Sequence, residues 1–386
     1  MKVLFILIQK EVKKMIETGI ITFHCADNVG AVLQVYALQQ ALRKLNVESE
    51  IIDFRPEFLI IPYDDKIYWI NSIKKIGLLR TIKRNIIKFL HIPSIRKRIS
   101  AFNNFRDKNL IISKSLYLTE EELKTNPPVY KYYISGSDQV WNPNFFTQTG
   151  DPYFLDFAPE NSIKISYAAS IADKVAPDLN DRFKNNIGRF NHISIREKEH
   201  LDILKELTNK SIIITLDPTL LLEKSDFANV LIEPEIEYKY ILVYDLQINE
   251  ELIKLANKIS REKGYKVISF SDFCNYDEWI KSFQYEGPGE FLGYVEKAEL
   301  VLSTSFHGVA FSIIYNKSFY TIPHTARGSR MIELLTSIGL DDRIIYKADE
   351  LKNIGYEIDY KNSLKMLQIR KTESINFLIN ALDIEN

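Results

Sequence analysis

The chain is poor in cysteine, because its 386 residues include only Cys25 and Cys274. These two lie far apart, without a Cys-x-x-Cys pair or paired histidines nearby, which excludes a disulfide scaffold, argues against a metal site and fits a reducing cytoplasm. No apolar run is long enough to span a membrane. Neither sign of charge dominates, since 50 Lys and Arg face 51 Asp and Glu, so the composition predicts no nucleic-acid partner.

The chain also has no glycine series of the GxGxxG type. The loop at Asn28–Gly30 carries one glycine, so a dinucleotide site is not expected and Asp53 is not interpreted as a ribose-binding residue. The apolar run Val3–Ile8 is too short for an export signal, and charged residues follow it at once. We expect residues 1–18 to be an extension ahead of the first strand.

The length and the alternation of apolar segments favour two α/β domains. The expected parts are 19–222 as an N-terminal Rossmann-like domain, 223–237 as a linker, 238–345 as a second Rossmann-like domain and 346–386 as a helical segment that packs on either domain. Strand-helix-strand units of this length make parallel open sheets, and ligands bind outside the carboxyl ends of the strands. The fold class expected is therefore two open sheets facing a cleft.

Residues 73–108 form a basic insertion whose only acid is Asp107. Apolar residues recur between the lysines and arginines at helical spacing, and Pro93 interrupts the pattern. One interpretation is a helical insertion that packs its apolar side on its own domain. The other is a surface that contacts an anionic membrane, a charged polymer or a lipid-linked substrate, which would place the protein at the inner face of the membrane.

Candidate binding residues follow several predicted strands. Asn28 and Gly30 follow the strand 19–24, and turn chemistry alone is the other explanation for them. Asp138, Gln139 and Trp141 follow the strand 129–134; carboxylate, amide and indole suit a sugar, although such clusters also occur as tight turns around a buried tryptophan. Further candidates are Arg196, with surface ion pairing as its alternative, and Arg327 and Arg330 in a basic loop after the strand 319–323.

The most informative segment is 300–315, where an apolar strand runs through Ser303, Thr304 and Ser305 into His307, Gly308 and an apolar helix. Free N–H groups at a helix start favour anions, and an imidazole beside them can move a proton. Gly308 lets a ligand approach the backbone. The other interpretation makes His307 a cap or a packed core residue.

These motifs occur in an order that resembles the polysaccharide pyruvyl transferases. The resemblance runs from about residue 19 to residue 343. The segments that carry it are Thr22-Phe23-His24, Asn28-Val29-Gly30-Ala31-Val32-Leu33-Gln34, Gly136-Ser137-Asp138-Gln139-Val140-Trp141-Asn142, Ser194-Ile195-Arg196-Glu197, Asp217-Pro218-Thr219-Leu220-Leu221, Ser305-Phe306-His307-Gly308 and Arg327-Gly328-Ser329-Arg330.

The resemblance implies a fold similar to the GT-B glycosyltransferases. It also implies transfer of the carboxyvinyl carbon of phosphoenolpyruvate onto two hydroxyls of a sugar, with release of phosphate and without a metal or a resident cofactor. Arg196 and Arg327, with Arg330 in reserve, are expected to hold the donor anions, together with Ser305 and Gly308. Many members carry an arginine where this chain has Ser305, so Arg327 or Arg330 would have to replace that charge.

The same resemblance suggests roles for the remaining candidates. His307 would donate a proton to the vinyl carbon or assist phosphate departure, and Asp138 would orient or deprotonate the acceptor hydroxyl. Asn28, Gly30 and Gln139 would contact the acceptor while Trp141 stacks on it. Two other functions remain open, a GT-B glycosyltransferase that uses a nucleotide sugar and a non-catalytic binding protein of polysaccharide assembly.

Overall fold

The computed structural model of the chain describes residues 16–60, 96–146, 150–173, 179–270, 281–282, 286–324, 328–351 and 357–384. The predicted amphipathic helix before Pro93, the predicted donor ligand Arg327 and almost all of the expected extension lie outside these residues.

The first sheet has seven strands among the described residues, all parallel, in the order β3-β2-β1-β4-β5-β6-β7. The order reverses between β1 and β4, which makes the gap beyond their carboxyl ends the expected ligand site of this unit. The strands are β1 (Thr18–Ile21), β2 (Ser49–Phe54), β3 (Ile112–Tyr117), β4 (Tyr132–Ser135), β5 (Ile163–Ala169), β6 (His192–Ile195) and β7 (Ile212–Ile214).

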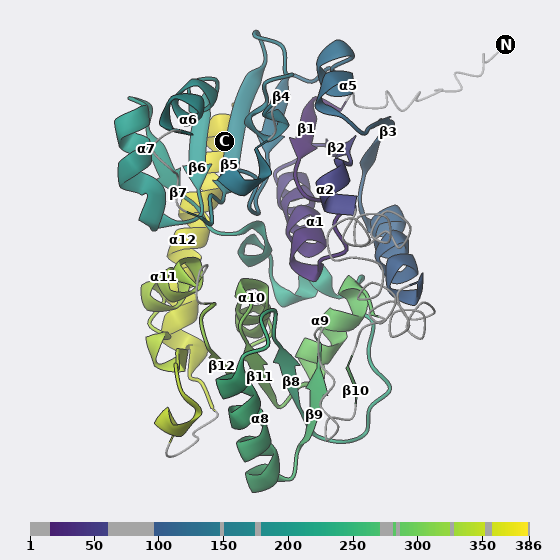
Figure 1. The fold of residues 1–386 in the computed structure, drawn as a ribbon, viewed down its shortest axis with the longest axis vertical. Coiled ribbons are helices and arrows are strands. Elements are labelled where there is room, and N and C mark those ends of the chain that lie inside the picture. Colours follow the sequence, from purple (N-terminus) through teal and green to yellow (C-terminus); the bar gives the residue numbers. More distant parts are fainter. Residues whose placement is uncertain are drawn as a thin grey trace, which may run out of the picture.

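The second sheet has five described strands, also parallel, in the order β10-β9-β8-β11-β12. It repeats the pattern of the first, with its own reversal between β8 and β11. The strands are β8 (Tyr240–Tyr244), β9 (Lys266–Ser269), β10 (Lys281–Ser282), β11 (Leu300–Ser303) and β12 (Phe319–Thr321). Two Rossmann-like open sheets, one above the other in Figure 1, confirm the expected GT-B-like fold class.

The helices named by label are those that connect or cover these strands. They are α1 (Val29–Lys44), α2 (Glu57–Ile60), α5 (Glu120–Thr125), α6 (Asn180–Ile187), α7 (Leu201–Leu207), α8 (Glu250–Lys263), α9 (Pro288–Lys297), α10 (Phe306–Ile314), α11 (Ser329–Ser337) and α12 (Tyr360–Ala381). Residues 96–109 are also helical.

One continuous apolar core joins the two sheets. It includes buried side chains of α1 from the first unit and of α9 and α10 from the second, and Phe227 packs edge to face on Phe311 within it. Tyr36 of α1 reaches the same cluster and donates a hydrogen bond to the backbone oxygen of Asp226 at 3.0 Å. Because the two units share this core, the point where the strand order reverses in the first sheet is held at a fixed distance from the corresponding point in the second sheet.

Helix α12 crosses from one unit to the other (Figure 1). At its start, the Tyr360 hydroxyl donates to the backbone oxygen of Lys317 at 2.6 Å, which ties it to the second unit. Further along, the hydroxyl of Ser374 accepts from the Leu216 N–H at 2.9 Å and Phe377 packs against Tyr167, both contacts to the first unit. The final helix therefore packs on both domains and not on one of them.

The described part of the basic insertion packs on its own domain. The Arg106 guanidinium pairs with the Asp27 carboxylate at 2.7 Å, and Arg98 donates to the Asp27 backbone oxygen at 2.8 Å. On the same helix Phe102 is fully buried. For residues 96–108 the packing interpretation is therefore correct, and two of the basic side chains hold the loop that follows β1.

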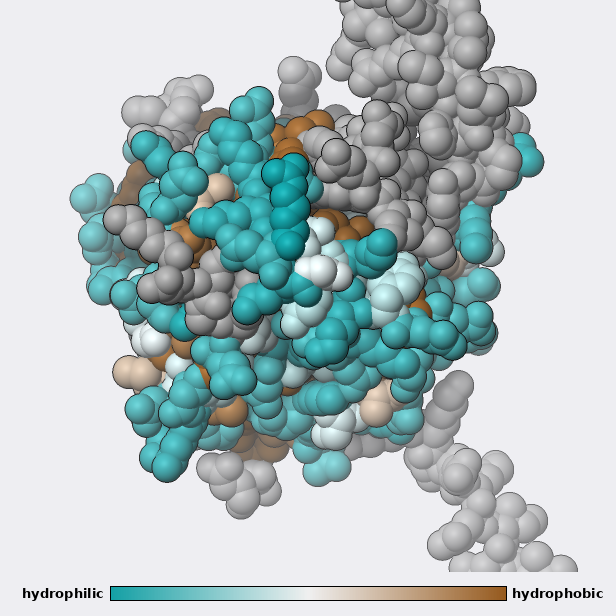
Figure 2. Space-filling model, turned by 90° about the horizontal axis from the view of Figure 1, so that it is seen from below, coloured by the Kyte–Doolittle hydropathy of each residue, from teal (hydrophilic) through white to brown (hydrophobic). Residues whose placement is uncertain are grey.

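Strand β3 was not predicted. It lies at the edge of the first sheet, and three of its six residues are exposed, so its sequence Ile-Ser-Lys-Ser-Leu-Tyr lacks the apolar run of a buried strand. Figure 2 shows a mainly hydrophilic described surface at the lower end of the molecule, with apolar residues in small patches. Within the described part of the chain, no helix has the length and apolarity needed to cross a membrane.

Candidate functional site

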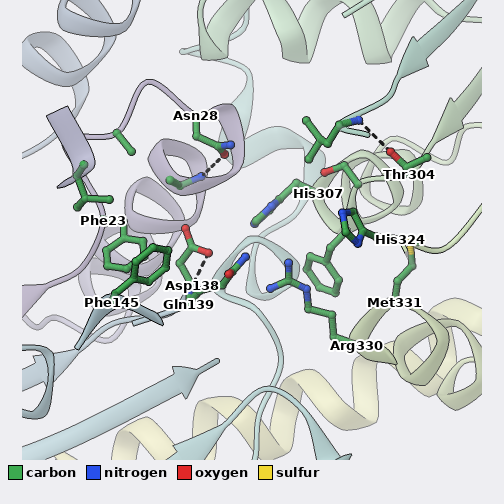
Figure 3. Close-up of a pocket in the computed structure, with 16 residues that line it drawn as sticks. Phe23, Asn28, Asp138, Gln139, Phe145, Thr304, His307, His324, Arg330 and Met331 are labelled. Atoms are coloured by element: carbon green, nitrogen blue, oxygen red, sulfur yellow. Dashed lines mark hydrogen bonds between the residues drawn. The ribbon is translucent and has the colours of Figure 1, made fainter. Parts of the chain in front are cut away.

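A cavity of about 380 Å³ lies between the carboxyl ends of the two sheets. Loops after β1 and β4 line it from the first unit, and loops after β8, β11 and β12 line it from the second (Figure 3). The lining residues are Phe23, Ala26, Asn28, Ala31, Leu59, Asp138, Gln139, Phe145, Leu246, Thr304, Ser305, Phe306, His307, His324, Arg330 and Met331. The cavity thus collects predicted site residues from both switch points.

The start of α10 opens onto this cavity. Ser305 is the N-cap residue, but its side chain makes no capping hydrogen bond, and the first helical bond runs from the Val309 N–H to the Ser305 oxygen. The first-turn N–H groups are therefore left without a capping side chain. Such groups, with the positive end of the helix dipole, attract an anion.

His307 lies in the first turn of α10 and is only 8% exposed. Its Nε2 is buried without a hydrogen-bond partner, 3.6 Å from Oδ2 of Asp217. Its Nδ1 lies beside α1, where a Cβ on Gly30 would come within 2.1 Å of it. The imidazole therefore lies between Asp217 and α1, and His307 also lines the cavity.

Asp217 is a buried carboxylate on which several elements converge. Its Oδ2 pairs with Arg196 Nη2 at 2.9 Å and accepts from the Ser137 hydroxyl at 3.3 Å, while Oδ1 accepts from the N–H and the hydroxyl of Thr219. Burial alone would raise the pKa of this carboxyl, but the charge of Arg196 and the contacts with His307 and Thr219 outweigh burial and hold the pKa well below its usual range. The Asp217 carboxylate is therefore a permanent negative charge behind His307.

Sequence reasoning quoted Asp217 as part of a motif but did not choose it as a site residue. The signal was present, because Asp217 directly follows the apolar run Ile212-Ile213-Ile214-Thr215-Leu216, as the other candidates follow their strands. What the sequence could not show is that this strand end lies behind the start of α10, which belongs to the other unit.

Arg196 does not line the cavity, contrary to its predicted role as the main donor ligand. It is 5% exposed, pairs with Asp217, donates to the Ser137 hydroxyl and lies over the Phe306 ring. Its Nε and Nη1 have no hydrogen-bond partner. The ion pair with Asp217 is buried rather than on the surface, so the direct effect of Arg196 is to fix Asp217.

Arg330 is the arginine that does line the cavity (Figure 3). Its guanidinium lies 5.8 Å from the centre of the Phe306 ring, and Nη1 reaches the Ser170 hydroxyl at 3.5 Å, which itself donates to the buried Glu197 carboxylate. Burial, and then the charge of Arg196, lower the pKa of Arg330. Its Nε has no partner, and it forms no salt bridge with a described residue. A cation in this position is ready to bind an anion.

Asp138 faces the cavity from the loop after β4 (Figure 3). Its backbone has φ of 78°, a left-handed conformation that aspartate adopts more readily than most residues, and its Oδ1 accepts from the Gln139 N–H at 2.9 Å. The second carboxylate oxygen accepts from no described residue. Gln139 and Asn28 also line the cavity; the Asn28 side chain caps α1 by accepting from the Ala31 N–H at 3.1 Å.

Trp141 is a core residue and does not face the cavity, so the prediction that it stacks on a sugar is not supported. Its indole is fully buried, stacks on Phe154 at 5.0 Å between ring centres and donates to the Tyr153 backbone oxygen at 3.3 Å. The alternative interpretation of this segment, a tight turn around a buried tryptophan, is the one that the structure shows.

Both site glycines are required for close packing. A Cβ on Gly308 would come within 2.2 Å of the Ser303 hydroxyl. This glycine therefore lets α10 pack closely on β11. The predicted reason for it was that a ligand approaches the backbone there. Gly30 lies beside His307 and is not among the residues that line the cavity. Among the described residues, no group of three or more His, Cys, Asp or Glu side chains is arranged to hold a metal ion.

A sequence model of the polysaccharide pyruvyl transferases matches residues 28–325, which is well over half of the chain. The chain belongs to the polysaccharide pyruvyl transferase family. The matched region includes all residues of the cavity except Phe23, Ala26, Arg330 and Met331.

Solved structures with detectable similarity are remote. The S. aureus MnaA–UDP complex is 11% identical, with 95% of this chain and 96% of that chain covered and a TM-score of 0.49. The UDP-N-acetylglucosamine 2-epimerase of Rickettsia bellii is 9% identical, with coverages of 95% and 96% and a TM-score of 0.49. No curated protein matches the chain.

Replacing Asp217 by Asn should destabilise the fold, because the Arg196 charge would remain buried without its partner. We expect a loss of about 3 kcal/mol in the free energy of unfolding at neutral pH, measured by denaturant titration. Because the folded-state pKa of Asp217 is lowered, its stabilisation is present above the ordinary pKa of 3.8 and lost as pH falls below it, so wild type and variant should converge in acid.

The matched control is Asp226→Asn, which removes a pair with the half-exposed Lys44. Its cost should stay below about 1 kcal/mol. Equal losses for the two variants would contradict the structural role assigned to Asp217.

Proposed function

We propose that the protein transfers the carboxyvinyl carbon of phosphoenolpyruvate onto two hydroxyls of a saccharide, which yields a pyruvate ketal and phosphate. The observation that carries this proposal is the convergence of Arg330, His307 and the uncapped start of α10 on one cavity. A cation, a proton carrier and a set of free N–H groups are what a small donor with a phosphate and a carboxylate requires.

Arg330 and the α10 start would hold the donor anions. Ser305, at the position where many family members carry arginine, is neutral, and the nearest described cation that lines the cavity is Arg330. The guanidinium groups of Arg330 and Arg196 lie 5.8 Å and 5.3 Å from the centre of the same Phe306 ring. We infer that Arg330 of α11 supplies the positive charge that Ser305 lacks.

His307 would supply the proton to the methylene carbon. Protonation there turns the methylene into the methyl group of the product while positive charge develops at the neighbouring carbon, which the first sugar hydroxyl attacks. Phosphate leaves and the second hydroxyl completes the ketal, so one hydroxyl proton ends on the methyl group and the other on phosphate. Asp217 lies 3.6 Å from Nε2 of His307 and would hold the ring in place for this step.

Asp138 would accept the proton of the attacking hydroxyl. It lines the cavity from the first unit, whereas Arg330 lines it from the second, and its open carboxylate oxygen can take a hydrogen bond from a sugar. Gln139 and Asn28 are beside it and can bind further hydroxyls. The saccharide acceptor follows from the family.

The direct test is to incubate the protein with phosphoenolpyruvate and a panel of nitrophenyl and lipid-linked sugars and to measure phosphate release. His307→Ala and Arg330→Gln should each lower turnover by at least about 100-fold, while Arg189→Gln, at an exposed arginine, should not. Consumption of a nucleotide sugar without phosphoenolpyruvate turnover would instead favour a glycosyltransferase, and binding of sugar without either reaction would favour a non-catalytic role.

Gly30→Ala should lower turnover by about 100-fold without removing any functional group, because the new Cβ would displace the His307 ring. The measurement is the turnover rate together with the unfolding midpoint. Gly188→Ala, at an exposed glycine with helical backbone, is the control and should be near wild type in both. Unchanged turnover in Gly30→Ala would remove the need for this ring position.

A further inference from the structure

Part of the cavity has no role in binding the donor. Its wall on the side of the first unit is apolar and is made by Phe23, Ala26, Ala31, Leu59 and Phe145. Phosphoenolpyruvate is small and carries a phosphate and a carboxylate, so an apolar wall offers it no favourable contact. The wall lies beside Asp138 and Gln139, the two residues assigned to the acceptor.

Phe145 is the half-buried aromatic of this wall and is rigidly held. One face of its ring is stacked on Phe58, with centres 5.2 Å apart and planes at 13°. Phe23 meets it edge to face at 5.5 Å. Because Phe58 covers one face, the surface that Phe145 presents is its other face and its rim.

The same short turn fixes Phe145 and Gln139. Phe145 ends the 3-10 turn Pro143–Phe145, which Asn142 caps by accepting from the Asn144 N–H at 2.9 Å. The side-chain nitrogen of Asn142 donates to Oε1 of Gln139 at 3.1 Å and to Asp173 at 2.9 Å. Asn142 therefore fixes the position of the Phe145 ring relative to the side-chain amide of Gln139.

We propose that Phe145 is the stacking platform for the acceptor, which is a pyranose bound with its C–H face on the ring and its hydroxyls toward Asp138 and Gln139. An aromatic face beside a carboxylate and an amide matches the amphipathic surface of a sugar ring, whereas a lipid chain would need no such polar groups. That the bound sugar is the acceptor of the reaction rests on the proposed function. It assigns to Phe145 the stacking role that Trp141 cannot fill.

The test measures binding without the donor. Affinities for methyl and octyl glycosides of glucose, galactose and mannose are determined by calorimetry for wild type, Phe145→Ala and Phe145→Trp. For the sugars that bind wild type, Phe145→Ala should weaken binding about tenfold for methyl and octyl glycosides alike, and Phe145→Trp should restore it. Phosphoenolpyruvate affinity should be the same in all three proteins.

Phe146→Ala is the matched control. Phe146 follows in the chain but packs on Phe154 and Phe183 and is not among the cavity residues, so its loss should leave sugar affinity unchanged once folding is verified by the unfolding midpoint. The proposal is overturned if methyl glycosides bind Phe145→Ala as well as wild type, if only octyl glycosides are affected, if Phe146→Ala has the same effect, or if none of the glycosides binds wild type. Sugar binding with the expected pattern but without phosphate release would refute the proposed reaction and leave the Phe145 platform standing.

Discussion

The structure of the site depends on one buried carboxylate. Asp217 forms an ion pair with Arg196 and accepts hydrogen bonds from the hydroxyls of Ser137 and Thr219. His307, which belongs to the other unit, lies beside the same carboxylate. A buried arginine without such a partner would be costly, and a buried carboxylate without it would be protonated. The pair is therefore what allows a fixed negative charge to stand behind the imidazole in a nearly dry interior. Asp217 also holds Arg196 through Nη2, while Nε and Nη1 of the same guanidinium have no hydrogen-bond partner.

The position of that carboxylate relative to His307 depends on the packing between the sheets. The apolar core that runs from α1 to α10 and the crossing helix α12 hold the two units as one body, so the strand ends of the first face the helix start of the second. Polar and charged groups lie at the rim of this core, where the parallel strands stop. Gly30 permits the closest approach across the interface, since any side chain there would occupy the space of the His307 ring.

The periodicity of the sequence was sufficient to predict most of the described strands and helices of both open sheets, although not β3, β10, α5 or α6. It also predicted the position of His307 at a helix start. Periodicity does not predict which side chains pair across the two units. For this reason Asp217 was not chosen as a site residue, and Arg196 was predicted to bind the donor without its ion pair to Asp217 being foreseen. Trp141 shows a second limit, because an indole at a strand end suits a sugar platform and a core equally well, and only packing against Phe154 decides between them. The edge strand β3 was missed because half of its residues are solvated.

The central claim is that the donor anion binds between Arg330 and the start of α10, in front of His307. A crystal structure of the protein with phosphoenolpyruvate tests it most directly. The account predicts a phosphate or carboxylate oxygen within hydrogen-bond distance of the Arg330 guanidinium and of a first-turn N–H of α10, with the methylene carbon next to the imidazole of His307. A donor bound away from Arg330, or one whose methylene carbon lies out of reach of His307, would contradict it.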